Sequence, residues 1–117
     1  MKERYEVVQD SNGKFYFHLR AADGAVLLSS LACDSKITAK NELLHLRNSL
    51  READRVIEHE AGDHTRFVVV KDHDGTVLAR SPHVDPATSF PVLLATIREA
   101  AGAPMLDLSK RRHATAT

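Results

Sequence analysis

The sequence has little of what secreted or membrane-spanning proteins depend on. Cys33 is its one cysteine, so no disulfide can form within the chain, and a small fold without disulfides is typical of a reducing compartment. No apolar run approaches the ~20 residues that span a bilayer. The charged start of the chain is not followed by the apolar segment of a secretory signal. We therefore expect a cytoplasmic protein that makes no contact with a membrane.

An excess of charge of either sign is also absent. Sixteen Lys and Arg residues balance sixteen Asp and Glu residues, so the formal net charge at pH 7 is zero. A strongly basic nucleic-acid-binding protein and an acidic solvating tail are both disfavoured. Hydrophobic residues make up 43% of the 117 residues and charged residues 27%, as in ordinary globular domains. We expect one domain at 1–109 and a mobile tail at 110–117, which lacks large apolar anchors.

The chain resembles itself when it is shifted by 51 residues. Residues 15–50 then align with 66–101 without a gap, and eight of the 36 positions are identical. The clearest match is that of residues 23–27 with 74–78. The sequence therefore predicts a duplicated unit, with copies at approximately 3–53 and 54–109.

Each unit is predicted to contain three strands that precede a helix. Residues 15–20 alternate between apolar and polar side chains, which is the period of a half-buried strand. The Asn-Gly pair at 12–13 and the Asp-Gly pairs at 23–24 and 74–75 are turn signals. The predicted strands are 5–9, 15–20 and 26–30, then 56–59, 67–71 and 77–81, and a last strand at 105–108.

Two apolar stripes predict the helices. Each stripe steps by four, three and four residues, which places its members on one helix face. The first consists of Ala39, Leu43, Leu46 and Leu50, and the second of Phe90, Leu94, Ile97 and Ala101. Leu43 and Leu94 occupy matched centres of the stripes, so we expect both to be deeply buried.

Polar residues before each stripe predict where the helices begin. Asp34 or Ser35 can cap the first helix, and Thr88 or Ser89 can cap the second. A start at residue 88 or 89 places Pro91 in the first turn, where its missing N–H does no harm. Gly102 and Pro104 end the second helix.

The order of elements predicts an α+β fold of two tandem β-β-β-α-β repeats. One antiparallel sheet carries both helices on one face. Strand-like segments occur before the first unit, between the units and after the second, so we expect each helix to be followed by an exchanged strand. Residues 54–59 should pair within the second unit, and residues 105–108 should pair back with the first.

The first unit resembles the repeat of the YegP-like family. The resemblance rests on the run Asn12-Gly13-Lys14-Phe15-Tyr16-Phe17, and on residues 4–6, 18–24, 29–30 and 35–36. The family consists of small, mostly bacterial proteins with one or two repeats and no established activity. It implies an α+β fold in which two repeats build one sheet that carries two helices.

The sequence departs from the family pattern at several positions. The family tends to have a tyrosine where Cys33 and Val84 stand. The second unit is the weaker match, because residues 64–66 are His-Thr-Arg rather than Gly-Lys-Phe, and Pro91 replaces a good helix former.

Seven histidines invite comparison with metal sites. His59 and His64 are five residues apart around a glycine, whereas a zincin needs two histidines four apart on a helix. Asp72 and Asp74, on either side of His73, begin like a calcium loop, but apolar residues follow where further ligands are needed. Polar hairpin loops are the simpler interpretation. We predict no metal ligand and no cofactor.

Nucleophilic catalysis also finds little support. Cys33 has no local signature of a reactive thiol, and Val84 is its repeat counterpart, so a packed cysteine is the better interpretation. Ser29 and Ser30 lack the glycines of a nucleophile elbow. No glycine-rich phosphate loop precedes a helix. We assign no catalytic residue and expect a protein that is not an enzyme.

A binding role remains. We expect a non-catalytic interaction module built from a duplicated repeat, with a protein partner or a second copy of itself. A weak nucleic-acid-binding sheet surface is the alternative, and a histidine–carboxylate metal-binding protein or enzyme is a further one. The nucleic-acid alternative rests on the outward residues Tyr16, His18, Arg20, Val69 and Lys71, and on Lys110-Arg111-Arg112.

Overall fold

The structure is a computed structural model that describes residues 2–87 and 89–110. None of the helices within these ranges has the length and hydrophobicity to cross a membrane. The predicted strands and helices are all found, with ends shifted by a few residues at most. They are β1 (Arg4–Gln9), β2 (Phe15–Arg20), β3 (Val26–Ser30), α1 (Lys36–Ser49), β4 (Val56–Glu60), β5 (Arg66–Lys71), β6 (Val77–Arg80), α2 (Ser89–Glu99) and β7 (Met105–Asp107).

All seven strands form one sheet in the order β4-β5-β6-β3-β2-β1-β7. The predicted pairing of the two segments that follow the helices is confirmed, since β4 pairs with β5 and β7 pairs with β1. The prediction of a fully antiparallel sheet is wrong at one edge, because β7 runs parallel to β1. The chain leaves α2 beside the start of β1, where the Tyr5 hydroxyl donates to the Ala100 carbonyl at 2.8 Å. From there β7 continues in the direction of β1, so the sheet is mixed.

Two parts of the chain make matching backbone contacts: the first half (residues 4–49, β1 to α1) and the second half (residues 56–99, β4 to α2). In the first half, the Ser30 hydroxyl accepts from the Phe17 N–H at 2.9 Å. In the second half, the Ser81 hydroxyl accepts from the Val68 N–H at 2.7 Å. Positions 51 residues apart therefore have the same structural role at this point.

The same correspondence holds elsewhere along the chain. Phe15 and Cys33 exchange two backbone hydrogen bonds, and so do Arg66 and Val84. The two halves join through β3 and β6, where Ser29 pairs with Arg80. These two residues are themselves matched by the 51-residue shift. On one side of this pair the order is β3, β2, β1, and on the other side it is the matching order β6, β5, β4.

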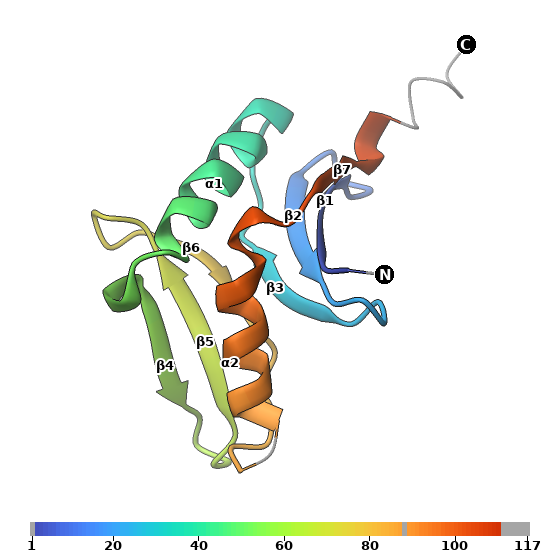
Figure 1. Cartoon of the computed structure of the whole chain (residues 1–117). Coiled ribbons are helices and arrows are strands. Elements are labelled where there is room, and N and C mark those ends of the chain that lie inside the picture. Colours follow the sequence, from blue (N-terminus) through green and yellow to red (C-terminus); the bar gives the residue numbers. More distant parts are fainter. Residues whose placement is uncertain (1, 88, 111–117) are drawn as a thin grey trace.

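Both helices cover the same face of the sheet (Figure 1), and one hydrophobic cluster joins residues of both halves. The Ser35 hydroxyl caps α1 by accepting from the Thr38 N–H at 3.1 Å, as one of the two predicted caps. Helix α2 begins at Ser89 and has Pro91 in its first turn, as predicted. The cap position before Ser89 is residue 88, which lies outside the described residues, as do 111–117 of the predicted tail.

The buried faces of the two helices differ in detail. Leu43 is 3% exposed, as predicted. The prediction for Leu94 is wrong: Leu94 is half-buried, whereas the neighbouring Leu93 is 7% exposed. Phe90 stands where α1 has the much smaller Ala39, and the buried Leu93 stands where α1 has the partly exposed Glu42, so the two helices bury different faces. The buried residues of α2 are Phe90, Leu93 and Ile97.

An ion cluster fastens β7 to α1. The Asp107 carboxylate lies 3.4 Å from the Lys36 ammonium and 3.2 Å from the Lys40 ammonium. Burial alone would raise the pKa of Asp107, but hydrogen bonds from Ser109 and Lys40, together with the charge of Lys36, hold it well below its usual range. The carboxylate is therefore ionised wherever the protein is folded near neutral pH.

Candidate functional site

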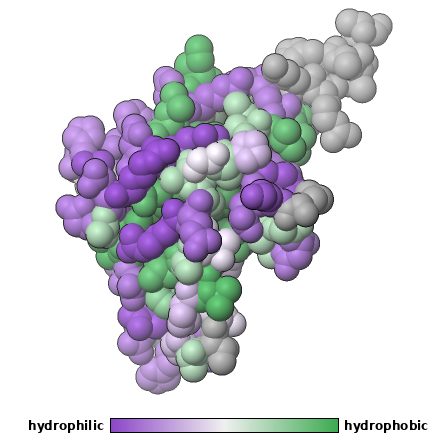
Figure 2. Space-filling model, in the orientation of Figure 1, coloured by the Kyte–Doolittle hydropathy of each residue, from purple (hydrophilic) through white to green (hydrophobic). Residues whose placement is uncertain are grey.

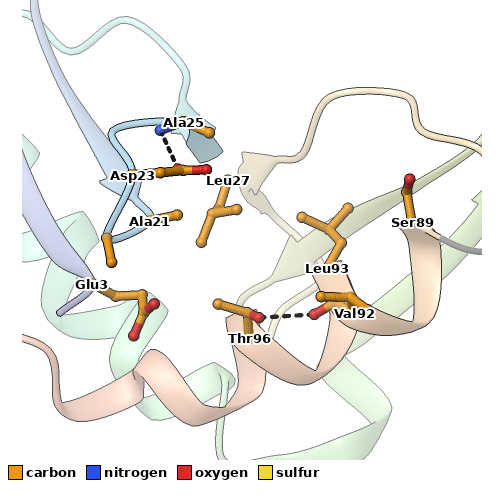
Figure 3. A pocket seen from close by; sticks show the side chains of 10 residues that line it. Glu3, Ala21, Asp23, Ala25, Leu27, Ser89, Val92, Leu93 and Thr96 are labelled. Atoms are coloured by element: carbon orange, nitrogen blue, oxygen red, sulfur yellow. Dashed lines mark hydrogen bonds between the residues drawn. The ribbon is translucent and has the colours of Figure 1, made fainter. Parts of the chain in front are cut away.

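A groove lies between α2 and the hairpin of β2 and β3 (Figure 3). Its volume is about 670 Å³, within the range of pockets that bind ligands. Leu27 and Leu93 approach each other from its two sides, and Val92 is 66% exposed beside them. The lining residues are Glu3, Ala21, Ala22, Asp23, Ala25, Leu27, Ser89, Val92, Leu93 and Thr96.

The local sequence explains why this groove is open and apolar. Gly24 has a φ of +92°, which permits a tight turn, and the Asp23 carboxylate accepts from the Ala25 N–H at 3.0 Å. The alanines around this turn leave the space unfilled. On the helix side, the Thr96 hydroxyl donates to the Val92 carbonyl at 2.8 Å, so it is satisfied within the helix. Hydrophobic residues thus reach the surface of the helix-bearing face among hydrophilic ones (Figure 2).

The matched junction, between α1 and the hairpin of β5 and β6, has a smaller hollow with a more polar lining. Its hollow has a volume of about 230 Å³. Glu42 stands there in the place of Leu93, and Thr76 in the place of Ala25. His45 on the helix and Asp72 on the hairpin lie 3.7 Å apart. The backbone hydrogen bond from His73 is the main reason that the pKa of Asp72 is lowered, and His45 adds to it.

The opposite face of the sheet carries most of the residues that the sequence predicted to face outward. A row of paired residues crosses six strands there: Glu6, His18, Ser29, Arg80, Val69 and Ile57. Glu6 is 6% exposed, between the guanidinium groups of Arg20 at 2.6 Å and Arg4 at 3.0 Å. Burial would raise the pKa of Glu6, but the hydrogen bonds from these arginines hold it below its ordinary value.

His18 and Ser29 form a pair that the sequence did not reveal. The Nδ1 atom of His18 lies 3.2 Å from the Ser29 hydroxyl. A serine nucleophile also requires a third group that orients the histidine. The two Glu6 oxygens are bound to Arg20 and Arg4 instead, and burial lowers the pKa of His18. The pair depends on the register of β2 and β3, which alternation alone does not give.

The histidines considered as metal ligands lie in different places. His59 packs on Phe67, His64 lies 3.3 Å from Glu60, and His73 lies 3.0 Å from Asp72. Within residues 2–87 and 89–110, no three His, Cys, Asp or Glu side chains gather as a metal site would require. The structure therefore brings together neither the pair at 59 and 64 nor the acidic residues at 72 and 74 as ligands.

Cys33 lies at the smaller junction, between β3 and α1. It is buried, and burial is the main reason that the pKa of its thiol is raised. The thiol points to the Leu31 carbonyl oxygen at 3.6 Å. Since the thiolate is the reactive form of cysteine, this environment lowers the reactivity of Cys33.

The chain is similar to a known family of proteins. Residues 10–56 match a family model described as a domain of unknown function, DUF1508. A 71-residue segment is 32% identical to the UPF0339 protein YegP of Yersinia pestis. This alignment covers 59% of the chain and 63% of that relative, which is less than two thirds of its length.

Two solved structures have the same fold. The solution NMR structure of YegP from E. coli, a protein of unknown function, superimposes with a TM-score of 0.84 at 20% identity, covering 93% of this chain and 95% of that one. The solution NMR structure of a UPF0339 protein from Shewanella oneidensis gives a TM-score of 0.88 at 21% identity, covering 97% of each chain. At these identities the likeness concerns the fold alone.

Proposed function

Since this chain belongs to the YegP-like family, whose matching domain has no known function, we propose that it is a non-catalytic interaction module. Its binding site is the groove between α2 and the hairpin of β2 and β3. The partner is a protein segment that inserts apolar side chains into the groove. This proposal includes a tandem origin, in which the two halves are copies of one repeat that complete each other.

The matching contacts of the two halves support the tandem origin. Ser30 and Ser81 accept from matched backbone N–H groups, and the joining pair of β3 and β6 consists of matched residues. Each helix also packs beside the hairpin of the other half, since residues of the helix and of that hairpin line both the groove and the smaller hollow at the matched junction. Such mutual covering is what a repeat too small to bury its own apolar face requires.

One observation carries the binding proposal: the two matched junctions differ in polarity. Junctions that serve packing alone need no open apolar surface, and the α1 junction has Glu42 and the His45–Asp72 pair. At the α2 junction, the exposed Val92 and the alanines of the hairpin leave apolar surface in contact with solvent. Apolar grooves of this kind mark interaction sites.

The charges of the groove indicate the chemistry of the partner. Glu3 and Asp23 are among its lining residues, whereas no lysine or arginine is. A segment with apolar residues next to a lysine or arginine complements this lining, because carboxylates at the edge of an interface favour cationic partners. We therefore assign a basic, apolar peptide segment as the occupant.

The environments of the nucleophile candidates support a role without catalysis. Cys33 is buried with a raised thiol pKa. Glu6, the carboxylate nearest in the row to His18 and Ser29, is bound by two arginines. Ser30 is bound into the backbone of β2 and Leu31. Each of these side chains therefore has a structural role.

Amide NMR spectra of the full chain test the proposal. The probe is a short peptide with Leu and Phe between two lysines, and the control peptide has glutamates in place of the lysines. We expect the lysine peptide to shift amide signals of residues 21–27 and 89–96, with the glutamate peptide binding at least fivefold more weakly. Val92→Asn, which introduces the residue that α1 has at the matched position 41, should weaken binding.

A matched variant provides the control for Val92→Asn. Leu44 is 59% exposed on α1 and lies outside the groove lining, so Leu44→Asn removes similar apolar surface elsewhere. Equal weakening by both variants would contradict the proposal, as would shifts that avoid the groove. Dimerisation of the chain through the groove, detected by sedimentation and abolished by Val92→Asn, would replace the peptide partner with a second copy.

A further inference from the structure

A second hollow lies on the helix-free face of the sheet, in the second half. Its volume is about 280 Å³. In the strand register, His59 pairs with Phe67, Val69 with Arg80, and Lys71 with Val77. These six residues line the hollow. Two cationic side chains and two aromatic rings therefore surround one shallow space.

The cations of this hollow have no carboxylate partner among the described residues. The first half shows what such a partner would look like, because Arg20, the match of Lys71, is bound to Glu6 at 2.6 Å. In β4 the place of Glu6 is taken by Ile57. An uncompensated pair of cations on a sheet is suited to an anion.

The carboxylates closest in sequence are engaged elsewhere. Glu58 lies 3.5 Å from Arg66, and Glu60 lies 3.3 Å from His64. Asp72 lies near His45 of α1, on the helix-bearing side. The charge of Lys71 and Arg80 is thus available to a ligand on the helix-free face.

Three stacked rings extend along the edge of this hollow. Phe67 lies between His59, with ring centres 5.2 Å apart, and His83, with ring centres 4.4 Å apart. The planes differ by 16° and 11°, so each imidazole has one face on Phe67 and one turned away from it. Aromatic faces beside cations are the features with which sheet proteins hold unpaired bases. At the matched positions, the first half has Val8, Tyr16 and Ala32 and no such stack.

We propose that this hollow binds single-stranded nucleic acid. A phosphate lies between Lys71 and Arg80, and the adjoining base stacks on an outer imidazole face of the ring stack. The polar row continues from Arg80 to Ser29 and His18 across the centre of the sheet, which suits an extended ligand better than a compact one. Binding is weak and tolerant of base sequence, because stacking accepts every base.

Fluorescence anisotropy of the full chain tests this site. The probe is a labelled oligothymidylate of about 12 nucleotides at low salt. With two phosphate contacts, we expect log K to fall with log salt at a slope of about −1.4. Arg80→Ser, which introduces the residue of the matched position 29, should weaken binding at least fivefold and reduce the slope by about 0.7. His83→Ala should weaken binding with the slope unchanged.

Arg51→Ser is the charge-matched control, because Arg51 is an exposed arginine at the end of α1. Its affinity should stay within twofold of that of the wild type. No binding at low salt, or equal losses with Arg51→Ser and Arg80→Ser, would overturn the proposal, as would oligonucleotide-induced amide shifts that leave residues 57–83 unaffected. Shifts caused by inorganic phosphate but not by the oligonucleotide would also overturn it. Val92→Asn should leave this binding unchanged, so the groove proposal stands or fails separately.

Discussion

The first and second halves share a backbone plan but differ in what they leave open. The outer edge of β1 is paired with β7, whereas β4 has no outer partner among the described strands. At the paired edge, Lys36 and Lys40 of α1 contact Asp107 of β7. At the matched positions, the second half has Ala87 and Pro91. The lysines that contact β7 in the first half therefore have no counterparts in the second half.

The largest expected effect tests the difference between the helix faces. Leu43→Ala should lower the free energy of unfolding by about 2–5 kcal/mol, as truncation in a packed core does. Leu94→Ala should cost about 1 kcal/mol, because its side chain is half-buried. Urea denaturation measures both values. Equal losses of stability at positions 43 and 94 would mean that both leucines are equally buried, contrary to the structure.

A truncated chain tests the role of β7, which covers the outer edge of β1. A chain ending at residue 103 lacks β7 and should lose about 2–3 kcal/mol of stability, because the contacts of Met105 and the ladder with β1 disappear. It should also self-associate, since the open edge of β1 can pair with another chain. Thermal melts and sedimentation provide the readouts. The control ends at residue 109 and should behave as the full chain does; an unchanged monomer after the cut at 103 would contradict the role of β7.

The variant Asp107→Asn tests the charge of Asp107 while β7 itself is kept. The variant should be about 1–3 kcal/mol less stable at pH 7, because Lys36 and Lys40 lose a charged partner. Folding lowers the pKa of Asp107, so its contribution is present above the ordinary aspartate pKa of about 4 and is lost as the pH falls further. The difference between wild type and variant should therefore narrow below about pH 4. A difference that does not depend on pH would contradict the ion cluster.

The smallest effect concerns matched turns. Gly13 has a φ of +82°, and His64, at the matched position, has a φ of +70°. A residue with a Cβ atom is strained in this region, whereas glycine is not. His64→Gly should therefore raise the stability by about 1 kcal/mol, and Gly13→His should lower it by a similar amount. Chemical denaturation measures the stability of both variants. A destabilising His64→Gly would contradict the backbone strain expected at His64.

Much of the fold could be predicted because it depends on local patterns. Alternation located β2, and counting strand-like segments gave the partners of β4 and β7. The direction of β7 could not be predicted, since it depends on where α2 ends relative to β1. The choice of Leu93 over Leu94 depends on helix rotation, and a stripe is too broad to fix that rotation.

The candidate sites were harder to predict because they form between segments that are distant in the sequence. The groove requires the knowledge that α2 faces the hairpin of the other half. The stack of His59, Phe67 and His83 combines β4, β5 and the segment after β6. The outward residues Arg20 and Lys71 were identified from alternation, but their different charge environments depend on Glu6 and Ile57 in neighbouring strands.

The pairing of Tyr5 with Met105 has a consequence for folding during synthesis. The ribosome releases β1 early, but its partner β7 emerges about 100 residues later, after some 5–20 seconds at ordinary rates of elongation. During this interval β2 and β3 can already form a hairpin sheet with β1, whose outer edge is exposed to other nascent chains. Closing so long a loop is also slow compared with hairpin formation. β7 can therefore join the sheet only after the strand that it pairs with has long been synthesised.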